Sequence, residues 1–176
     1  MNIEVMYKKL RLSRDLSNAG YQSRLCNEWH RKTLAHNTVC WNGTDITSVE
    51  PGKCLLFEND RVRCKAENVY EGIDYTRELK ITENSVLDYF QVEGKTGVYD
   101  YTFHFEPGIE LSCDLPTEAA DLGFSENGYQ HVLETKKVKT DQNAVVLRAQ
   151  LGRVDAGSGR SPGRAGTVPA ENQGQP

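Results

Sequence analysis

The chain has 176 residues, a length typical of one ordinary domain of roughly 100–200 residues, so we expect a single globular domain over residues 1–152. Its 38% hydrophobic and 26% charged residues suit one compact core, and no stretch approaches the roughly 20 apolar residues of a membrane-spanning helix. The net charge of −4 would repel nucleic acid and anionic membranes, so we expect neither as a partner.

The N-terminal residues and the cysteines favour an intracellular protein. Charged residues interrupt every apolar run near the start of the chain, before the apolar region of a signal peptide, about 7–15 residues long, could form. The five cysteines are an odd number, which does not suit a complete disulfide framework. We therefore expect a cytoplasmic protein without such a framework.

Residues 17–36 have the pattern of an amphipathic helix. Tyr21, Leu25 and Trp29 recur at four-residue intervals and form one apolar stripe, while charged side chains of the segment lie off it. Gly20 weakens the first turn, and Asn37 is a suitable end. We predict a helix that packs this stripe against the rest of the domain.

Residues 38–115 have the turn spacing of a β-meander. Asn-Gly and Pro-Gly turn sequences recur at short intervals, and about six segments rich in β-branched or aromatic residues lie between them. In the segment 98–105, Tyr99, Tyr101, Phe103 and Phe105 alternate with other residues. The aromatic side chains should therefore share one buried face.

These segments predict an α+β domain that is mainly antiparallel β, with the N-terminal helix packed on a meander of about six strands. The sheet either closes into a small barrel or, in the alternative, forms a β-sandwich to which the C-terminal segment adds a strand. Residues 116–151 should contain a short helix at 116–122, capped by Thr117, and a terminal helix or strand at 129–138. Residues 153–176 contain repeated glycine and proline and no aromatic residue, which predicts a disordered tail.

Four residues in the first third of the chain have the chemistry of a zinc site, namely Cys26, His30, His36 and Cys40. Cys26 and His30 would lie one helical turn apart and could share an ion. His36 and Cys40 would be about 13 Å apart in an extended strand, which is too far. We therefore expect no metal here, and a zinc-stabilised interaction module is only a second alternative.

Cys54 and Cys64 form a candidate redox pair, because they flank the turn at Asn59-Asp60. A three-residue loop would place the two cysteines directly opposite each other, whereas a two-residue loop would put them out of line. The register of the hairpin therefore decides whether their thiols can meet, and the sequence leaves this open.

The segment 98–105 also carries the candidate ligand-binding residues. Asp100 and His104 share its more polar face with Thr102, but neighbours on one face are about 6.8 Å apart, so Asp100 cannot reach His104 directly. If residues 85–92 pair with this segment across the turn at Gly94 to Gly97, Tyr89 lies opposite Thr102. One cleft would then be lined by Tyr89, Asp100, Thr102 and His104.

The chain lacks the common catalytic and nucleotide-binding motifs, since no phosphate loop, nucleophile elbow, dinucleotide fingerprint or His-Glu-x-x-His pattern occurs. We predict a non-enzymatic binding or accessory protein whose sheet or small-barrel pocket receives a small apolar ligand or a protein partner. The alternative is a small β-rich enzyme that uses His104 with a carboxylate from another strand. The sequence leaves the catalytic residues, any cofactor and the oligomeric state open.

Overall fold

The computed structural model describes residues 1–16 and 20–151, which form two compact units. Unit 1 contains Ile46–Val98 together with Met1, and unit 2 contains Asn2–Asp45 and the chain from Tyr99 onward. Antiparallel β-sheet is the main regular structure in both, as predicted, and no sheet among the described residues closes into a barrel. The single domain over residues 1–152 stays a prediction, and the tail expected at 153–176 lies outside the described residues.

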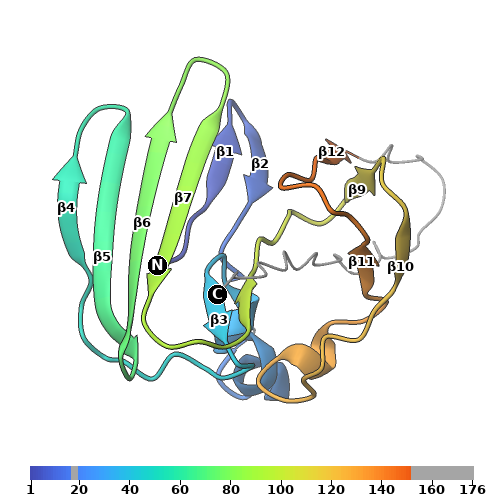
Figure 1. Cartoon of the computed structure of the whole chain (residues 1–176), viewed down its shortest axis with the longest axis horizontal. Coiled ribbons are helices and arrows are strands. Elements are labelled where there is room, and N and C mark those ends of the chain that lie inside the picture. The colour runs from blue at the N-terminus through green and yellow to red at the C-terminus, as the bar shows by residue number, and fades with distance from the viewer. Residues whose placement is uncertain (17–19, 152–176) are drawn as a thin grey trace. The chain divides into compact units, whose positions relative to one another are not determined.

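Unit 1 is one four-stranded sheet in the order β4-β5-β6-β7, with all neighbours antiparallel (Figure 1). Its strands are β4 (Lys53–Phe57), β5 (Arg61–Tyr70), β6 (Ile73–Ile81) and β7 (Val86–Glu93). They correspond to four of the predicted strands, and their order confirms the meander for this part of the chain.

The two faces of this sheet differ because alternate residues point to opposite sides. On one face, Ile73 and Tyr75 are fully buried, and Arg77 is buried beside them. The Arg77 guanidinium makes two hydrogen bonds to the Asp88 carboxylate, at 2.9 and 2.6 Å, and a third at 2.7 Å to the carbonyl O of Met1. These contacts compensate the burial of the charge. The opposite face carries the charged side chains of β5 and β6.

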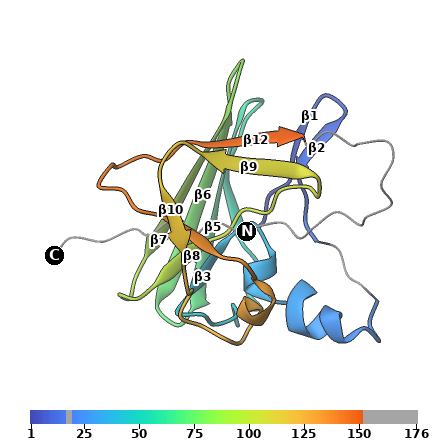
Figure 2. The ribbon, with the colours of Figure 1, turned by 90° about the vertical axis from the view of Figure 1, so that its right-hand side faces the viewer.

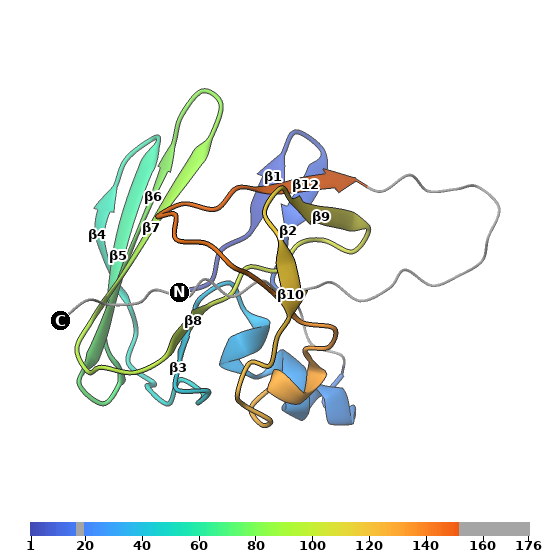
Figure 3. The same ribbon diagram turned by 45° about the vertical axis from the view of Figure 1, so that its right-hand side comes forward.

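In the part of unit 2 that the structure describes, there are four small antiparallel sheets, each of two strands. The pairs are β1 (Val5–Tyr7) with β2 (Leu10–Ser13), β3 (Val39–Trp41) with β8 (Tyr99–Tyr101), β9 (Ile109–Cys113) with β12 (Leu147–Leu151), and β10 (Thr117–Ala119) with β11 (Lys136–Val138). Figure 2 shows β12 beside β9, and Figure 3 shows the β1–β2 hairpin. The C-terminal segment thus adds a strand, while the β-sandwich itself stays a prediction.

The predicted pairing of residues 85–92 with residues 98–105 is wrong. Tyr89 lies opposite Glu78 of β6, and β8 pairs with β3. Just beyond β8, the backbone N–H of Thr102 donates to the carbonyl O of Thr38 at 2.9 Å. The chain after the turn at Gly94 therefore joins a strand from much earlier in the sequence instead of extending the meander.

The continuous helix predicted at 17–36 is also wrong; its first three residues lie outside the described part, and the rest contains only short helical segments separated by a break. These are η1 (Cys26–His30) and the 3-10 turn η2 (Thr33–Ala35). Between them Lys32 is extended, with φ −87° and ψ 142°. The carboxylate of Asp45 holds this break, because it accepts the Thr33 backbone N–H at 2.9 Å and the Lys32 ammonium at 2.8 Å. Tyr21, which began the expected apolar stripe, is 80% exposed.

The helix predicted at 116–122 is also wrong. Thr117 begins the strand β10 and does not cap a helix. The Glu118 carboxylate forms ion pairs with Lys137 and Lys139 at 3.4 and 3.3 Å, which supports pairing with β11. The segment 129–138 contains both elements that the sequence left open, the 3-10 turn η3 (Tyr129–His131) and then β11.

A buried asparagine connects the segments of unit 2. Asn37 has no exposed surface, and its side-chain NH₂ donates to the Ile3 carbonyl O and the Ser13 hydroxyl, both at 2.8 Å. Its side-chain O accepts the backbone N–H of His104 at 2.6 Å. Next to it lies a small apolar core of Leu34, Cys40 and Tyr129. One amide thus fixes three chain segments that are far apart in the sequence.

Candidate functional site

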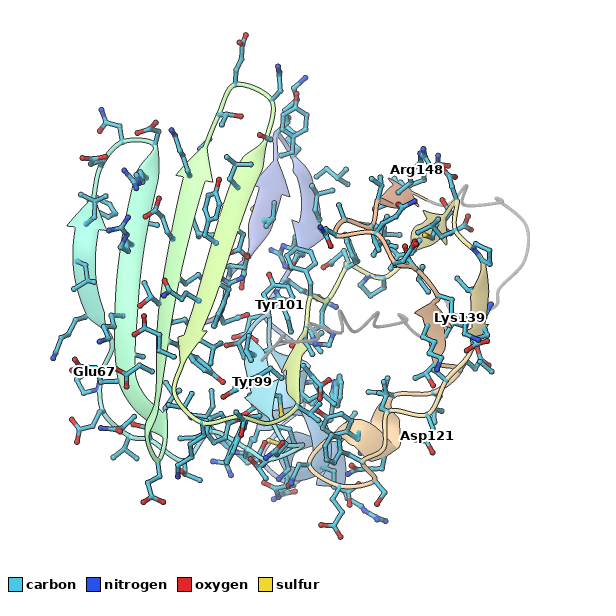
Figure 4. The ribbon with its side chains drawn as sticks, in the orientation of Figure 1. Glu67, Tyr99, Tyr101, Asp121, Lys139 and Arg148 are labelled. Carbon is cyan, nitrogen blue, oxygen red and sulfur yellow. The ribbon has the colours of Figure 1, made fainter. Side chains whose placement is uncertain are left out.

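The faces of the segment 98–105 are the reverse of those predicted. Thr102 and His104 are 2% and 7% exposed, whereas Phe103 and Phe105 are only partly buried. The reason is that unit 2 offers backbone acceptors to the polar side, and the strand itself ends at Tyr101 (Figure 4). The polar residues therefore lie inside unit 2 and do not line an open cleft.

His104 has the environment of a structural histidine. Its Nε2–H donates to the carbonyl O of Leu34 at 2.8 Å, and the ring packs edge-on against Trp29. Burial lowers the pKa of His104 below its ordinary value, with the hydrogen bond to Leu34 acting in the opposite direction. The imidazole is therefore neutral near neutral pH, and its Nε2–H is held by the Leu34 carbonyl O. A histidine in this state does not suit proton transfer.

Asp100 is likewise engaged inside unit 2, since its carboxylate accepts the hydroxyl of Tyr129. Burial, and then this hydrogen bond, raise the pKa of Tyr129 far above its ordinary value. A cavity of about 10 Å³ lies beside them, lined by Asp100, Tyr101 and Thr102 among others. That volume holds about one water molecule, so this cavity has no room for a small apolar ligand.

The fourth predicted residue, Tyr89, belongs to unit 1 and lines an open groove of about 670 Å³ on the charged face of the sheet. The groove crosses all four strands, and its residues are Leu55, Arg61, Arg63, Thr76, Glu78, Lys80, Tyr89 and Gln91. The register explains this grouping, because Arg63, Glu78 and Tyr89 lie opposite one another across β5, β6 and β7. The sequence indicated Tyr89 but missed the basic residues around it.

The groove is positively charged, although the whole chain is acidic. Three cations face one acid, since Arg61, Arg63 and Lys80 surround Glu78. The Glu78 carboxylate accepts the Nε–H of Arg61 at 2.7 Å and the Nε–H of Arg63 at 2.5 Å. Burial alone would raise the pKa of Glu78, but these hydrogen bonds lower it overall, so the carboxylate stays charged and holds both guanidiniums in place.

Unit 2 contains a second arrangement with potential chemistry, a histidine oriented by a carboxylate. The Nδ1–H of His36 donates to the Asp15 carboxylate at 2.7 Å, and both side chains are partly exposed. The backbone of His36 is fixed, because its carbonyl O accepts the Thr102 hydroxyl at 2.5 Å and the Thr38 N–H at 3.0 Å. No motif relates positions 15 and 36, so this pair could not be predicted from the sequence.

Three of the four residues considered for zinc have separate partners, and the fourth, Cys26, is buried. The ring of His30 donates to the Leu16 carbonyl O at 2.9 Å, and the Cys40 thiol donates to the Thr44 carbonyl O at 3.1 Å. His36 is bonded to Asp15 as described above. Within residues 1–16 and 20–151, no group of three or more metal-binding side chains comes together.

The chain matches no protein-family model and no curated protein sequence. In the described part of the chain, no helix has the length and apolar character needed to cross a membrane. The functional significance of the unit 1 groove and of the His36–Asp15 pair in unit 2 therefore rests on their geometry.

Proposed function

We propose that this chain is a binding protein and that its ligand occupies the groove on the charged face of the β4–β7 sheet. The observation that carries the proposal is the fixed pair of guanidiniums of Arg61 and Arg63, beside Lys80 and Tyr89, in a groove of about 670 Å³. A volume of this size lies within the roughly 300–1,000 Å³ of typical ligand sites.

The chemistry of the groove favours a ligand that carries carboxylates over the small apolar ligand expected from the sequence. A guanidinium has five N–H donors, and Glu78 uses only part of those on Arg61 and Arg63. Both arginine side chains remain partly exposed, at 35% and 43%. Tyr89 adds an apolar ring and Gln91 an amide, which suit a ligand with a flat, hydrogen-bonding body.

The test is calorimetric titration with two carboxylate probes, a short oligoglutamate peptide and a short oligomer of uronic acid sugars. Binding by one probe alone identifies a peptide or a sugar as the source of the carboxylates. Arg63→Gln should weaken binding of the effective probe at least tenfold, about 1.4 kcal/mol, because a charge-assisted hydrogen bond is lost. The unfolding midpoint reports whether the fold is retained.

Lys53→Gln is the matched control, because Lys53 is an exposed cation of the same sheet that pairs with Glu67 outside the groove. It should leave the affinity unchanged. The proposal would be contradicted if neither probe binds, or if Lys53→Gln and Arg63→Gln lose the same amount of affinity for the probe.

A second candidate function follows from the His36–Asp15 pair. A carboxylate on Nδ1 fixes the tautomer and leaves Nε2 without a hydrogen, which is the tautomer of a general base. The enzyme alternative expected from the sequence is therefore proposed with His36 and Asp15 in place of His104. The geometry of the pair supports proton transfer but does not identify a substrate.

An activated ester such as p-nitrophenyl acetate is a suitable probe for this second candidate. If His36 acts as a base, the protein should hydrolyse the ester about tenfold or more faster than the His36→Gln variant. His30→Gln is the control, because His30 is also a part-buried histidine bonded through Nδ1, but to the carbonyl O of Leu16. Equal rates in all three proteins would exclude the general-base role.

The proposal keeps the cytoplasmic location expected from the sequence. A reducing compartment would hold all five cysteines as thiols, which is their state in the structure.

A further inference from the structure

Cys54 and Cys64 lie directly opposite each other on β4 and β5. The turn between these strands is tight, since the Glu58 N–H donates to the Arg61 carbonyl O at 2.8 Å and only two residues lie between them. A regular ladder from this turn would place Leu55 opposite Cys64. The register shifts between Cys54 and Leu56, and this bulge brings Cys54 into line with Cys64.

The two thiols are close enough to interact electrostatically, and they differ in exposure. Cys54 is exposed, whereas Cys64 is partly buried. Burial, and then the charge and hydrogen bond of Cys54, raise the pKa of the Cys64 thiol. Cys54 is therefore the thiol that an external reagent meets first, and Cys64 is the neighbour that can react next.

We propose that Cys54 and Cys64 form a reversible disulfide within the sheet by exchange with a small external disulfide of the glutathione type. The inference is independent of the proposed ligand in the groove. Antiparallel neighbours have Cα atoms about 4.5–5.5 Å apart, which lies within the range that a disulfide bridge spans.

The reaction balances in two exchanges. The Cys54 thiolate attacks one sulfur of the external disulfide, a new S–S bond forms, and the first external thiolate leaves. The Cys64 thiolate then attacks the sulfur of Cys54, closes the bridge between the strands and releases the second external thiolate. Two protein thiols are oxidised, the external disulfide is reduced to two thiols, and the two protons of the protein thiols end on the leaving groups.

The experiment exposes reduced protein to oxidised glutathione at increasing ratios, counts the remaining thiols under denaturing conditions and maps the peptides. The wild type should lose two thiols and the mass of two hydrogens, with one linked peptide that joins Cys54 to Cys64. Cys113→Ser, which removes a partly buried cysteine of unit 2, should behave in the same way.

The Cys64→Ser variant separates the first step, attack of Cys54 on the external disulfide, from the second, formation of the Cys54–Cys64 bond. Without the second thiol, glutathione should stay attached to Cys54, and circular dichroism shows whether this variant folds. The proposal is overturned if wild-type Cys54 keeps its glutathione adduct, if the bridge joins another cysteine or a second chain, or if wild-type thiols do not react. Cys54→Ser provides a second test, because it should leave Cys64 much less reactive towards oxidised glutathione.

Discussion

Replacing Asn37 by alanine should destabilise unit 2 more than any exposed asparagine could. The amide is fully buried, donates to Ile3 and Ser13, and accepts the backbone N–H of His104. Alanine removes all three hydrogen bonds at once, and the three partner groups stay inside the protein without the hydrogen bond that the amide provided.

The magnitude follows from these three contacts. At about 1 kcal/mol net for each of the three hydrogen bonds, with an added cost of about 1–3 kcal/mol for a buried partner left unpaired, the loss in unfolding free energy is about 4–6 kcal/mol. A domain has only about 5–15 kcal/mol in total, so the variant should be close to unfolding at 37 °C.

Chemical denaturation followed by circular dichroism measures this difference. Asn84→Ala is the control, because Asn84 lies exposed in the turn between β6 and β7, and its replacement should change the unfolding free energy by less than about 0.5 kcal/mol. A loss below about 1 kcal/mol for Asn37→Ala would show that these hydrogen bonds do not hold the segments together.

Three other measurements test the described packing. Gly43→Ala should cost about 1–3 kcal/mol more than Gly108→Ala in denaturant unfolding, because both have positive φ but only at Gly43 would the new Cβ lie 2.5 Å from an aromatic ring. Because the pKa of His104 lies below the ordinary 6.5, the unfolded chain takes up this proton first. Its contribution to stability should fall as the pH drops below about 6.5, by at most about 1.4 kcal/mol per pH unit, and His104→Gln should remove that dependence. Arg77→Ala should cost about 3–5 kcal/mol, since it leaves Asp88 charged without its partner, and a double variant with Asp88→Ala should recover part of the loss.

Local chemistry predicted the turn at Asn42-Gly43 and the strands of unit 1 well. Asn42 and Gly43 both have positive φ, at 48° and 64°, and the Thr44 N–H closes the turn on the Trp41 carbonyl O at 3.0 Å. This follows from the residue types alone, since Asn-Gly favours that geometry. The strands of unit 1 were predictable for the same reason, because their alternation and turns lie within one short stretch.

What the sequence could not predict depends on partners far along the chain. The expected helix at 17–36 is interrupted at Lys32, where the carboxylate of Asp45 supplies the competing hydrogen bonds. Asp15 and His36 are 21 residues apart, and contacts of other segments in the folded unit hold them together. Even the alignment of Cys54 with Cys64 depends on a bulge, which the length of the turn could not reveal.

The path of the chain through the two units suggests how they could be separated. Apart from Met1, unit 1 is one continuous segment of the chain, from Ile46 to Val98. The strands on either side of it in the sequence, β3 and β8, are hydrogen-bonded to each other, with Trp41 opposite Tyr99. The chain therefore leaves unit 2 and returns to it at almost the same place, as it does around an inserted domain. A short turn joining Asp45 to Tyr99 would be enough to close this gap, so residues 46–98 interrupt unit 2 in sequence without separating its paired strands β3 and β8.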